Sequence, residues 1–146
     1  MLQTINKRRG GFTLVEIMIV VAIIALLAAI AVPNFLRARK RSQATIILEE
    51  LRVLQDADTL YQTDHPAVGA AFTSFDLLPY IKQGSNLYNA FDPGSNIFVD
   101  TLGNHFNGWA TPDGEAHWGV ADQTYSTLSD VAPLDFWSGY LPPDLQ

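Results

Sequence analysis

The chain has 146 residues, of which 48% are hydrophobic, with no cysteine and a formal net charge of −6 at pH 7. This length accommodates one small domain, and the lack of cysteine excludes a fold held by disulfides. From Ser42 onward, two basic residues stand against fourteen acidic ones, a net charge of −12. Because such a surface repels phosphate backbones, we expect no binding of nucleic acid by this part of the chain.

The first predicted element is a long apolar helix from Phe12 to about Phe35, without a charged residue between Ile17 and Val32. A helix of this length crosses an apolar layer of ~30 Å. Basic residues lie on both sides of it, at 7–9 and at 37–41, so charge alone does not fix its orientation in a membrane.

Glu16 lies near the start of this apolar segment. An ionised side chain within hydrocarbon costs roughly 2.5 to 3.5 kcal/mol on insertion scales, so we interpret Glu16 as a functional residue that needs a positive partner. Two alternatives stay open. A secretory signal peptide would be cleaved after Ala29-Ile30-Ala31, but the apolar stretch exceeds the usual ~7 to 15 residues. A plain membrane anchor would leave Glu16 unexplained.

Residues 11–16, Gly-Phe-Thr-Leu-Val-Glu, followed by the apolar helix and Pro33, resemble the class III signal of type IV pilins and type II secretion pseudopilins. The resemblance covers Lys7 to about Arg41. It implies that a membrane prepilin peptidase cuts between Gly11 and Phe12 on the cytoplasmic side and methylates the new amino group of Phe12. Residues 1–11 are then a cleaved cytoplasmic leader, and residues 12–35 are a transmembrane and filament-core helix.

The resemblance also gives Glu16 a role in assembly. In the family this glutamate pairs with the methylated amino terminus of a neighbouring subunit as the filament grows. The α-amine that cleavage creates is largely cationic at neutral pH. Because a pair in a low-dielectric seam is costly when one partner is missing, Glu16 would set the register of assembly rather than catalyse a reaction.

Pro33 lies inside the helical pattern, where it removes the hydrogen bond to the carbonyl of Ala29. The resemblance implies a role in assembly, because related helices lose helicity between the glutamate and this proline. A static kink is the alternative interpretation.

The helix is predicted to continue over residues 36–64 as an amphipathic helix that leads into the globular part, with its end at Asp64-His65-Pro66. Apolar residues recur there at spacings of three and four, and the acidic residues lie mostly elsewhere. The expected buried stripe consists of Ile47, Leu51, Leu54, Ala57 and Tyr61.

Residues 65–146 are expected to form a small globular head with a loop-rich C-terminal part, which borrows its core from the helix stripe. Candidate strands cover 97–99 and 106–110, and residues 75–81 read as a short helix. The predicted fold class is α+β: one long helix packed against a small antiparallel sheet, as in pilins.

Residues 100–106, Asp-Thr-Leu-Gly-Asn-His-Phe, are similar to a turn in the heads of type II secretion pseudopilins, although both prolines and the first aromatic residue of that turn are replaced. This similarity favours a pseudopilin. Major pseudopilins commonly hold a structural calcium ion, and the candidate ligands here are Asp113, Glu115, Asp122 and Asp130. Solvated loop carboxylates are the alternative.

An enzyme is not expected. His65, His105 and His117 are separated by long intervals and do not match a familiar metal-binding or catalytic motif. We therefore assign no catalytic residue and interpret the histidines as exposed or loop-structuring.

The resemblance implies that the chain is a structural subunit of a helical filament, the periplasmic pseudopilus of a type II secretion system. The expected partners are further copies of the chain or related subunits, the prepilin peptidase and methyltransferase, the membrane, and an inner-membrane assembly platform with its ATPase. The expected location is the bacterial inner membrane, in a single pass with the amino end cytoplasmic and the head periplasmic, and then the periplasmic filament. The alternatives are a type IV pilus subunit for adhesion, motility or DNA uptake, and a membrane-tethered binding module that does not polymerise.

Overall fold

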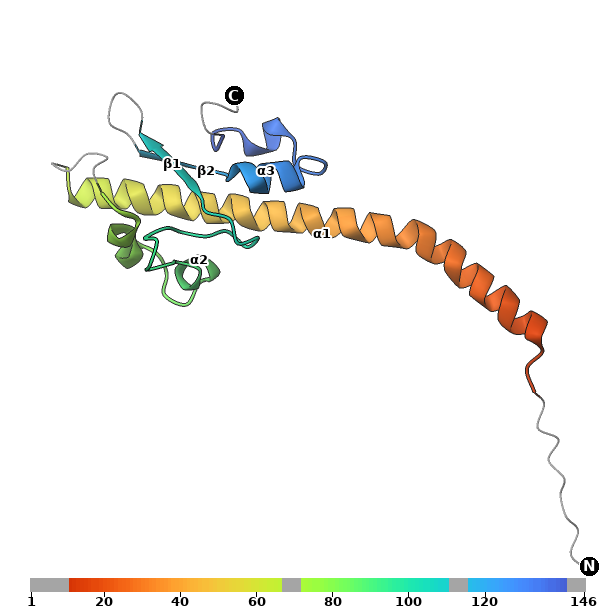
Figure 1. Cartoon of the computed structure of the whole chain (residues 1–146). Coiled ribbons are helices and arrows are strands. Elements are labelled where there is room, and N and C mark those ends of the chain that lie inside the picture. The colour runs from red at the N-terminus through yellow and green to blue at the C-terminus, as the bar shows by residue number, and fades with distance from the viewer. Residues whose placement is uncertain (1–10, 67–71, 111–115, 142–146) are drawn as a thin grey trace, which may run out of the picture. The chain divides into compact units, whose positions relative to one another are not determined.

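The computed structural model describes residues 11–66, 72–110 and 116–141 (Figure 1). It separates into two compact units, an N-terminal unit that ends at Arg37 and a C-terminal unit that begins at Ala38. The elements in chain order are α1 (Leu14–Asp64), a 3₁₀ helix (Ser74–Tyr80), α2 (Asn86–Asn89), β1 (Asn107–Ala110), β2 (Ala116–Gly119), α3 (Asp122–Leu128) and a second 3₁₀ helix (Leu134–Trp137).

In the N-terminal unit, α1 presents apolar side chains that the protein itself does not bury. Met18 and Leu26, for example, are 62% and 65% exposed. The most apolar 18-residue stretch of α1 has a mean hydropathy of 3.0, and none of it is buried within the chain. By length and composition, this is a helix that is able to cross a membrane. The prediction of an apolar N-terminal helix is therefore confirmed.

Helix α1 continues through Pro33 with helical residues on both sides. In membrane helices the missing backbone hydrogen bond of a proline is tolerated. The loss of helicity that the resemblance implies for the assembled filament is not present in the single chain, and it stays a prediction.

The core of the C-terminal unit is built on the predicted stripe of α1. Ile47, Leu51 and Leu54 are fully buried, Ala57 is 1% exposed and Tyr61 is half-buried. Figure 1 shows β1, β2 and α3 along one side of this part of α1 and α2 along the other. Buried apolar side chains from α2, β2, α3, the two 3₁₀ helices and the segment before β1 pack into this core: Leu77, Leu87, Phe98, Trp118, Leu128 and Trp137.

The two strands form an antiparallel hairpin in which Gly108 pairs with Trp118 and Asn107 with Gly119. Gly119 allows the chain to approach closely, because a Cβ atom there would lie 2.5 Å from the ring of Trp109 and 2.7 Å from the carbonyl oxygen of Tyr140. The side-chain amide of Gln55 on α1 donates to the carbonyl of Ala116 over 3.3 Å. A long helix packed against a small antiparallel sheet is the α+β fold that the sequence predicts.

The predicted strand at 97–99 is wrong. Its residues take part only in isolated bridges, Asp92 with Ile97 and Val99 with His105. The ladder ends there because the chain turns back at once, with the N–H of Asp100 bonded to the carbonyl of Asn104 over 2.8 Å. The strand predicted at 106–110 is confirmed as β1, and the short helix predicted at 75–81 is a 3₁₀ helix shifted by one residue.

Candidate assembly site

Thr13 and Glu16 form a reciprocal capping box at the start of α1. The backbone N–H and the hydroxyl of Thr13 each donate to Oε2 of Glu16 over 2.8 Å. In return, the backbone N–H of Glu16 donates to the Thr13 hydroxyl over 3.2 Å. This arrangement satisfies two N–H groups that a helix start otherwise leaves without a partner. The carboxylate is thus fixed at the first turn of the apolar helix.

Gly11 and Phe12 precede this cap and are accessible. Phe12 is 83% exposed, and a Cβ atom built on Gly11 would meet nothing within 4 Å. The bond between them, at which cleavage is predicted, is therefore not shielded by the described part of the chain. The preceding leader residues 1–10 lie outside the described residues.

The turn at 100–106 is held by one buried carboxylate. Oδ1 of Asp100 accepts hydrogen bonds from the backbone N–H groups of Leu102 and Asn104 over 2.8 and 3.0 Å. Its Oδ2 accepts from the hydroxyl of Thr124 on α3, and the side-chain amide of Asn104 donates to the same hydroxyl over 2.9 Å. Gly103 adopts a φ of +86°, which favours glycine. The residues that carry the resemblance therefore tie this turn to α3.

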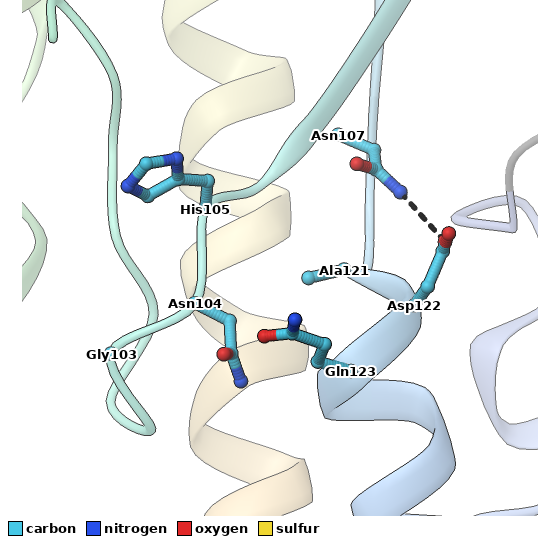
Figure 2. Close-up of a pocket in the computed structure, with 7 residues that line it drawn as sticks. All are labelled: Gly103, Asn104, His105, Asn107, Ala121, Asp122 and Gln123. Atoms are coloured by element: carbon cyan, nitrogen blue, oxygen red, sulfur yellow. Dashed lines mark hydrogen bonds between the residues drawn. The ribbon is translucent and has the colours of Figure 1, made fainter.

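A polar hollow of about 410 Å³ lies beside this turn and the start of α3 (Figure 2). The side-chain amide of Asn107 donates over 3.1 Å both to Oδ1 of Asp122 and to the carbonyl of Val120. In Figure 2 the imidazole of His105 points away from Asp122. The hollow therefore does not bring an acid and a base into contact.

Two of the four calcium candidates, Asp113 and Glu115, lie outside the described residues. Of the other two, Asp122 accepts from Asn107, and Asp130 forms an ion pair with Lys40 at 3.0 Å. An ammonium group at Asp130 disfavours a second cation there. Within the described ranges no three histidine or acidic side chains gather into a metal site. Calcium stays a prediction that these residues do not support.

The three histidines come from separate places. His65 stacks on Tyr61 with 4.5 Å between ring centroids, and His117 stacks on Trp109 with 5.8 Å. These contacts agree with the structural role expected for His65 and His117.

Two acidic residues of α1 are buried, although the sequence placed the acidic residues mostly away from the apolar stripe. Glu50 is 8% exposed and Asp58 is fully buried. The assignment failed for them because Glu50 follows Ile47 by three positions and Asp58 follows Leu54 by four, which puts both on the stripe. Their spacing, rather than their residue type, was the signal.

Burial shifts the titration of both groups. It raises the pKa of Glu50 to about 7, together with the negative charge of Asp100, and the backbone N–H of Thr101 acts in the opposite direction. Burial also raises the pKa of Asp58, while a hydrogen bond from Gln62 lowers it. One oxygen of each carboxylate, Oε2 of Glu50 and Oδ2 of Asp58, is buried without a hydrogen-bond partner.

Comparison of the sequence with known proteins gives independent matches to one family model and to several relatives. Residues 6–32 match a family model described as the prokaryotic N-terminal methylation motif. The chain is 37% identical to fimbrial protein Q of Moraxella bovis over 111 residues, which covers 66% of this chain and 71% of that protein. It is 25% identical to type II secretion system core protein G of Aeromonas hydrophila over 139 residues, covering 80% of this chain and 97% of that protein.

A shorter match joins the chain to the type IV wide pilus major component PilA4 of Thermus thermophilus. The two are 47% identical over 59 residues, which is 40% of this chain and 45% of that protein. The chain thus spans less than half the length of this relative. No solved structure matches the chain significantly.

Proposed function

The chain belongs to the family of type IV pilins and type II secretion pseudopilins, and on that premise we propose that it is a structural subunit of a type II secretion pseudopilus. The observation that carries the proposal is the start of α1, where a capped Glu16 heads a helix of exposed apolar side chains. In a filament these side chains would be buried against the helices of neighbouring subunits. Relatives of this kind are structural proteins, which points away from an enzyme.

Maturation would proceed by cleavage between Gly11 and Phe12 and methylation of the new amino group. Hydrolysis of this bond leaves the α-amine of Phe12 one residue before the Thr13–Glu16 cap. The amine of a neighbouring subunit would then supply the positive partner that a carboxylate in an apolar seam requires. The enzymes implied are a prepilin peptidase and methyltransferase, followed by an inner-membrane platform with its ATPase. The head would lie in the periplasm.

Two observations favour a pseudopilus. The match with protein G covers nearly the full length of that protein, and residues 100–106 form a turn tied to α3 through Asp100 and Thr124. The second candidate is a type IV pilus subunit. It is supported by the higher identity with fimbrial protein Q over a shorter part of both chains. A structural calcium ion would have to draw on Asp113 and Glu115, which lie outside the described residues, and an unchanged melting midpoint on calcium removal would exclude it.

The experiment that tests the proposal is replacement of the subunit in its native host by Glu16→Ala. We expect normal membrane insertion and no filaments, because the carboxylate needed for register is missing. The same strain reports the class of filament: loss of protein secretion indicates a pseudopilus, whereas loss of surface fibres with intact secretion indicates a pilus. Normal filaments from the variant would contradict the role of Glu16, and a silent variant would favour a tethered module that does not polymerise.

A further inference from the structure

A groove of about 370 Å³ runs beside α1 in the C-terminal unit. Its α1 wall includes Ile46, Glu50 and Val53, and the opposite wall includes Lys82 and Leu87. Ile46 and Val53 are each 41% exposed, so apolar surface stays open along the groove. The two residues are seven positions apart and therefore lie on one face of the helix. Isolated exposed apolar residues are ordinary, but a groove with an apolar wall that stays exposed is a typical docking surface.

Glu50 distinguishes this groove from a simple apolar cleft. Its side chain lines the groove, the residue is 8% exposed, and its Oε2 has no hydrogen-bond partner. A buried carboxylate oxygen without a partner is costly, and burial raises the pKa of Glu50 even though the backbone N–H of Thr101 acts in the opposite direction. Lys82 lies on the opposite wall but forms no ion pair with Glu50 in the part of the chain that the structure describes. The wall of the groove therefore contains a buried carboxylate oxygen for which the described part of the chain supplies no donor.

Arg39 and Arg41 are suitable cations. Both are exposed, and neither takes part in an ion pair among the described residues, whereas Lys40 between them is bound to Asp130 at 3.0 Å. They precede Glu50 by 11 and 9 positions on the same helix, which places them roughly 16 and 14 Å away along the axis. Because a straight helix does not fold back on itself, neither arginine is able to reach Glu50 of its own chain.

We propose that this groove receives Arg39 or Arg41 of a second copy of the chain and that Glu50 pairs with the incoming guanidinium. The inference rests on the proposed filament, in which copies run parallel. A parallel neighbour displaced by roughly 14 to 16 Å along the helix axis brings its arginines to the level of Glu50. The aliphatic stem of arginine would cover Ile46 and Val53, and its planar head would donate to the Glu50 carboxylate, whose buried Oε2 has no hydrogen-bond partner. This contact joins the basic segment of one subunit to the acidic globular part of another.

Charge exchange in the full-length chain tests the pair. We expect Glu50→Arg to reduce filament yield by roughly tenfold or more, because a buried charge would face a like charge. The double change Arg39→Glu with Arg41→Glu should do the same, and the combination of all three should restore filaments. Asp56→Asn is the matched control and should assemble normally, since Asp56 is exposed on the same helix and does not line the groove. Lys82→Ala removes the lysine on the opposite wall and tests whether Glu50 is paired within its own chain.

Cysteine cross-linking gives a second readout that keeps both arginines and the glutamate. The natural chain has no cysteine, so Ser42→Cys with Val53→Cys introduces the only two thiols. These positions are 11 residues apart on one helix, too far for a disulfide within one chain. We expect a ladder of covalent oligomers from filaments and monomers when Glu16→Ala is added. Ser42→Cys with Thr59→Cys, whose second thiol lies on another face, should give no ladder.

The outcomes separate this inference from the proposed function. If the natural chain forms no filaments, the proposed function itself fails. Natural filaments with no rescue by the triple exchange and no ladder overturn the inference alone. A Glu50→Arg variant that assembles normally but no longer supports secretion would assign the groove to a different partner and also overturn it. Loss of filaments in Lys82→Ala would mean that Glu50 pairs with Lys82 of its own chain, and would also overturn the inference.

Discussion

Thr13 and Glu16 hold each other at the start of α1 through three hydrogen bonds of 2.8 to 3.2 Å. The single chain thus gives the carboxylate a local partner before any second subunit is present. This contact lowers the cost of placing Glu16 at the start of an apolar helix and keeps its oxygens near the amino end of the helix, where the helix dipole favours a negative charge. Under the proposed function, it also presents Glu16 in one orientation to an incoming amine.

Replacement of Thr13 tests the helix cap separately from the charge of Glu16, because it removes the hydroxyl and keeps the carboxylate. We expect Thr13→Ala to fray the first turn of α1 at a cost of about 1 kcal/mol and to slow filament formation without abolishing it, because Glu16 remains. Thr13→Ser keeps the hydroxyl and should assemble at the natural rate. The measurement is filament yield over time at equal subunit levels. Thr13→Ala filaments that form as fast as natural ones would show that orientation by the cap is unimportant.

Replacement of Gly11 tests the predicted cleavage. Because a Cβ atom at this position meets nothing within 4 Å, a larger residue should leave the described structure unchanged. We therefore expect Gly11→Val to accumulate as a stable precursor in the membrane, whereas the natural chain begins at N-methylated Phe12. Intact mass and amino-terminal sequencing of the protein from membranes distinguish the two. A natural chain that begins at Met1 or Val32 would contradict the prepilin pathway.

Asp100 should be among the residues to which the C-terminal unit is most sensitive. Asp100→Ala leaves two backbone N–H groups and the Thr124 hydroxyl without their acceptor, and we expect a loss of about 2–4 kcal/mol in the free energy of unfolding. Gly103→Ala in the same turn has open space for its Cβ but a φ of +86°, so it should lose only about 1 kcal/mol. Thermal unfolding of the full chain in detergent measures both. Equal losses would mean that backbone conformation, rather than the carboxylate, holds the turn.

The sequence predicts those structural features that depend on residues close together in the chain, and it does not predict those that depend on distant residues. The stripe from Ile47 to Tyr61 repeats within one helix, so periodicity is sufficient to find it. Strand β2, Ala-His-Trp-Gly, has no β-branched residue and ends in a glycine that is required by the ring of Trp109, so propensity does not reveal it. The bond between Asp100 and Thr124 joins residues 24 positions apart and exists only after α3 packs against the turn.

Of the two glutamates proposed to act in assembly, the sequence identifies Glu16 but not Glu50. Glu16 is found from sequence because a carboxylate near the start of a membrane helix is costly, and the spacing Thr-x-x-Glu is the local signal for its cap. Glu50 was missed because its residue type indicates solvent, whereas its position between Ile47 and Leu54 on the helix indicates the core. Only the structure adds that a groove opens beside it.

The raised pKa of Glu50 makes the stability of the single chain depend on pH. Below about 4.5 the carboxyl is protonated in both the folded and the unfolded chain, and burial costs little. As the pH rises from 4.5 to about 7, the unfolded chain ionises while the folded chain holds its proton, so the free energy of unfolding should fall by roughly 2–3 kcal/mol, some of which solvent screening removes. Glu50→Gln should remove most of this fall and stabilise the subunit at pH 7. Asp58, whose pKa burial also raises, contributes a fall of the same sign.

The measurement is the unfolding free energy of the full-length chain in detergent, at intervals between pH 4 and 8. Asp100 and Lys82 are the charged groups on the segments beside Glu50, so Lys82→Ala is the matched control and should keep the fall. In assembled filaments an arginine at Glu50 would favour the ionised form, and raising the pH through 7 should then strengthen rather than weaken the contact between subunits. A pH dependence that is the same in natural and Glu50→Gln chains would show that this carboxylate is solvated after all.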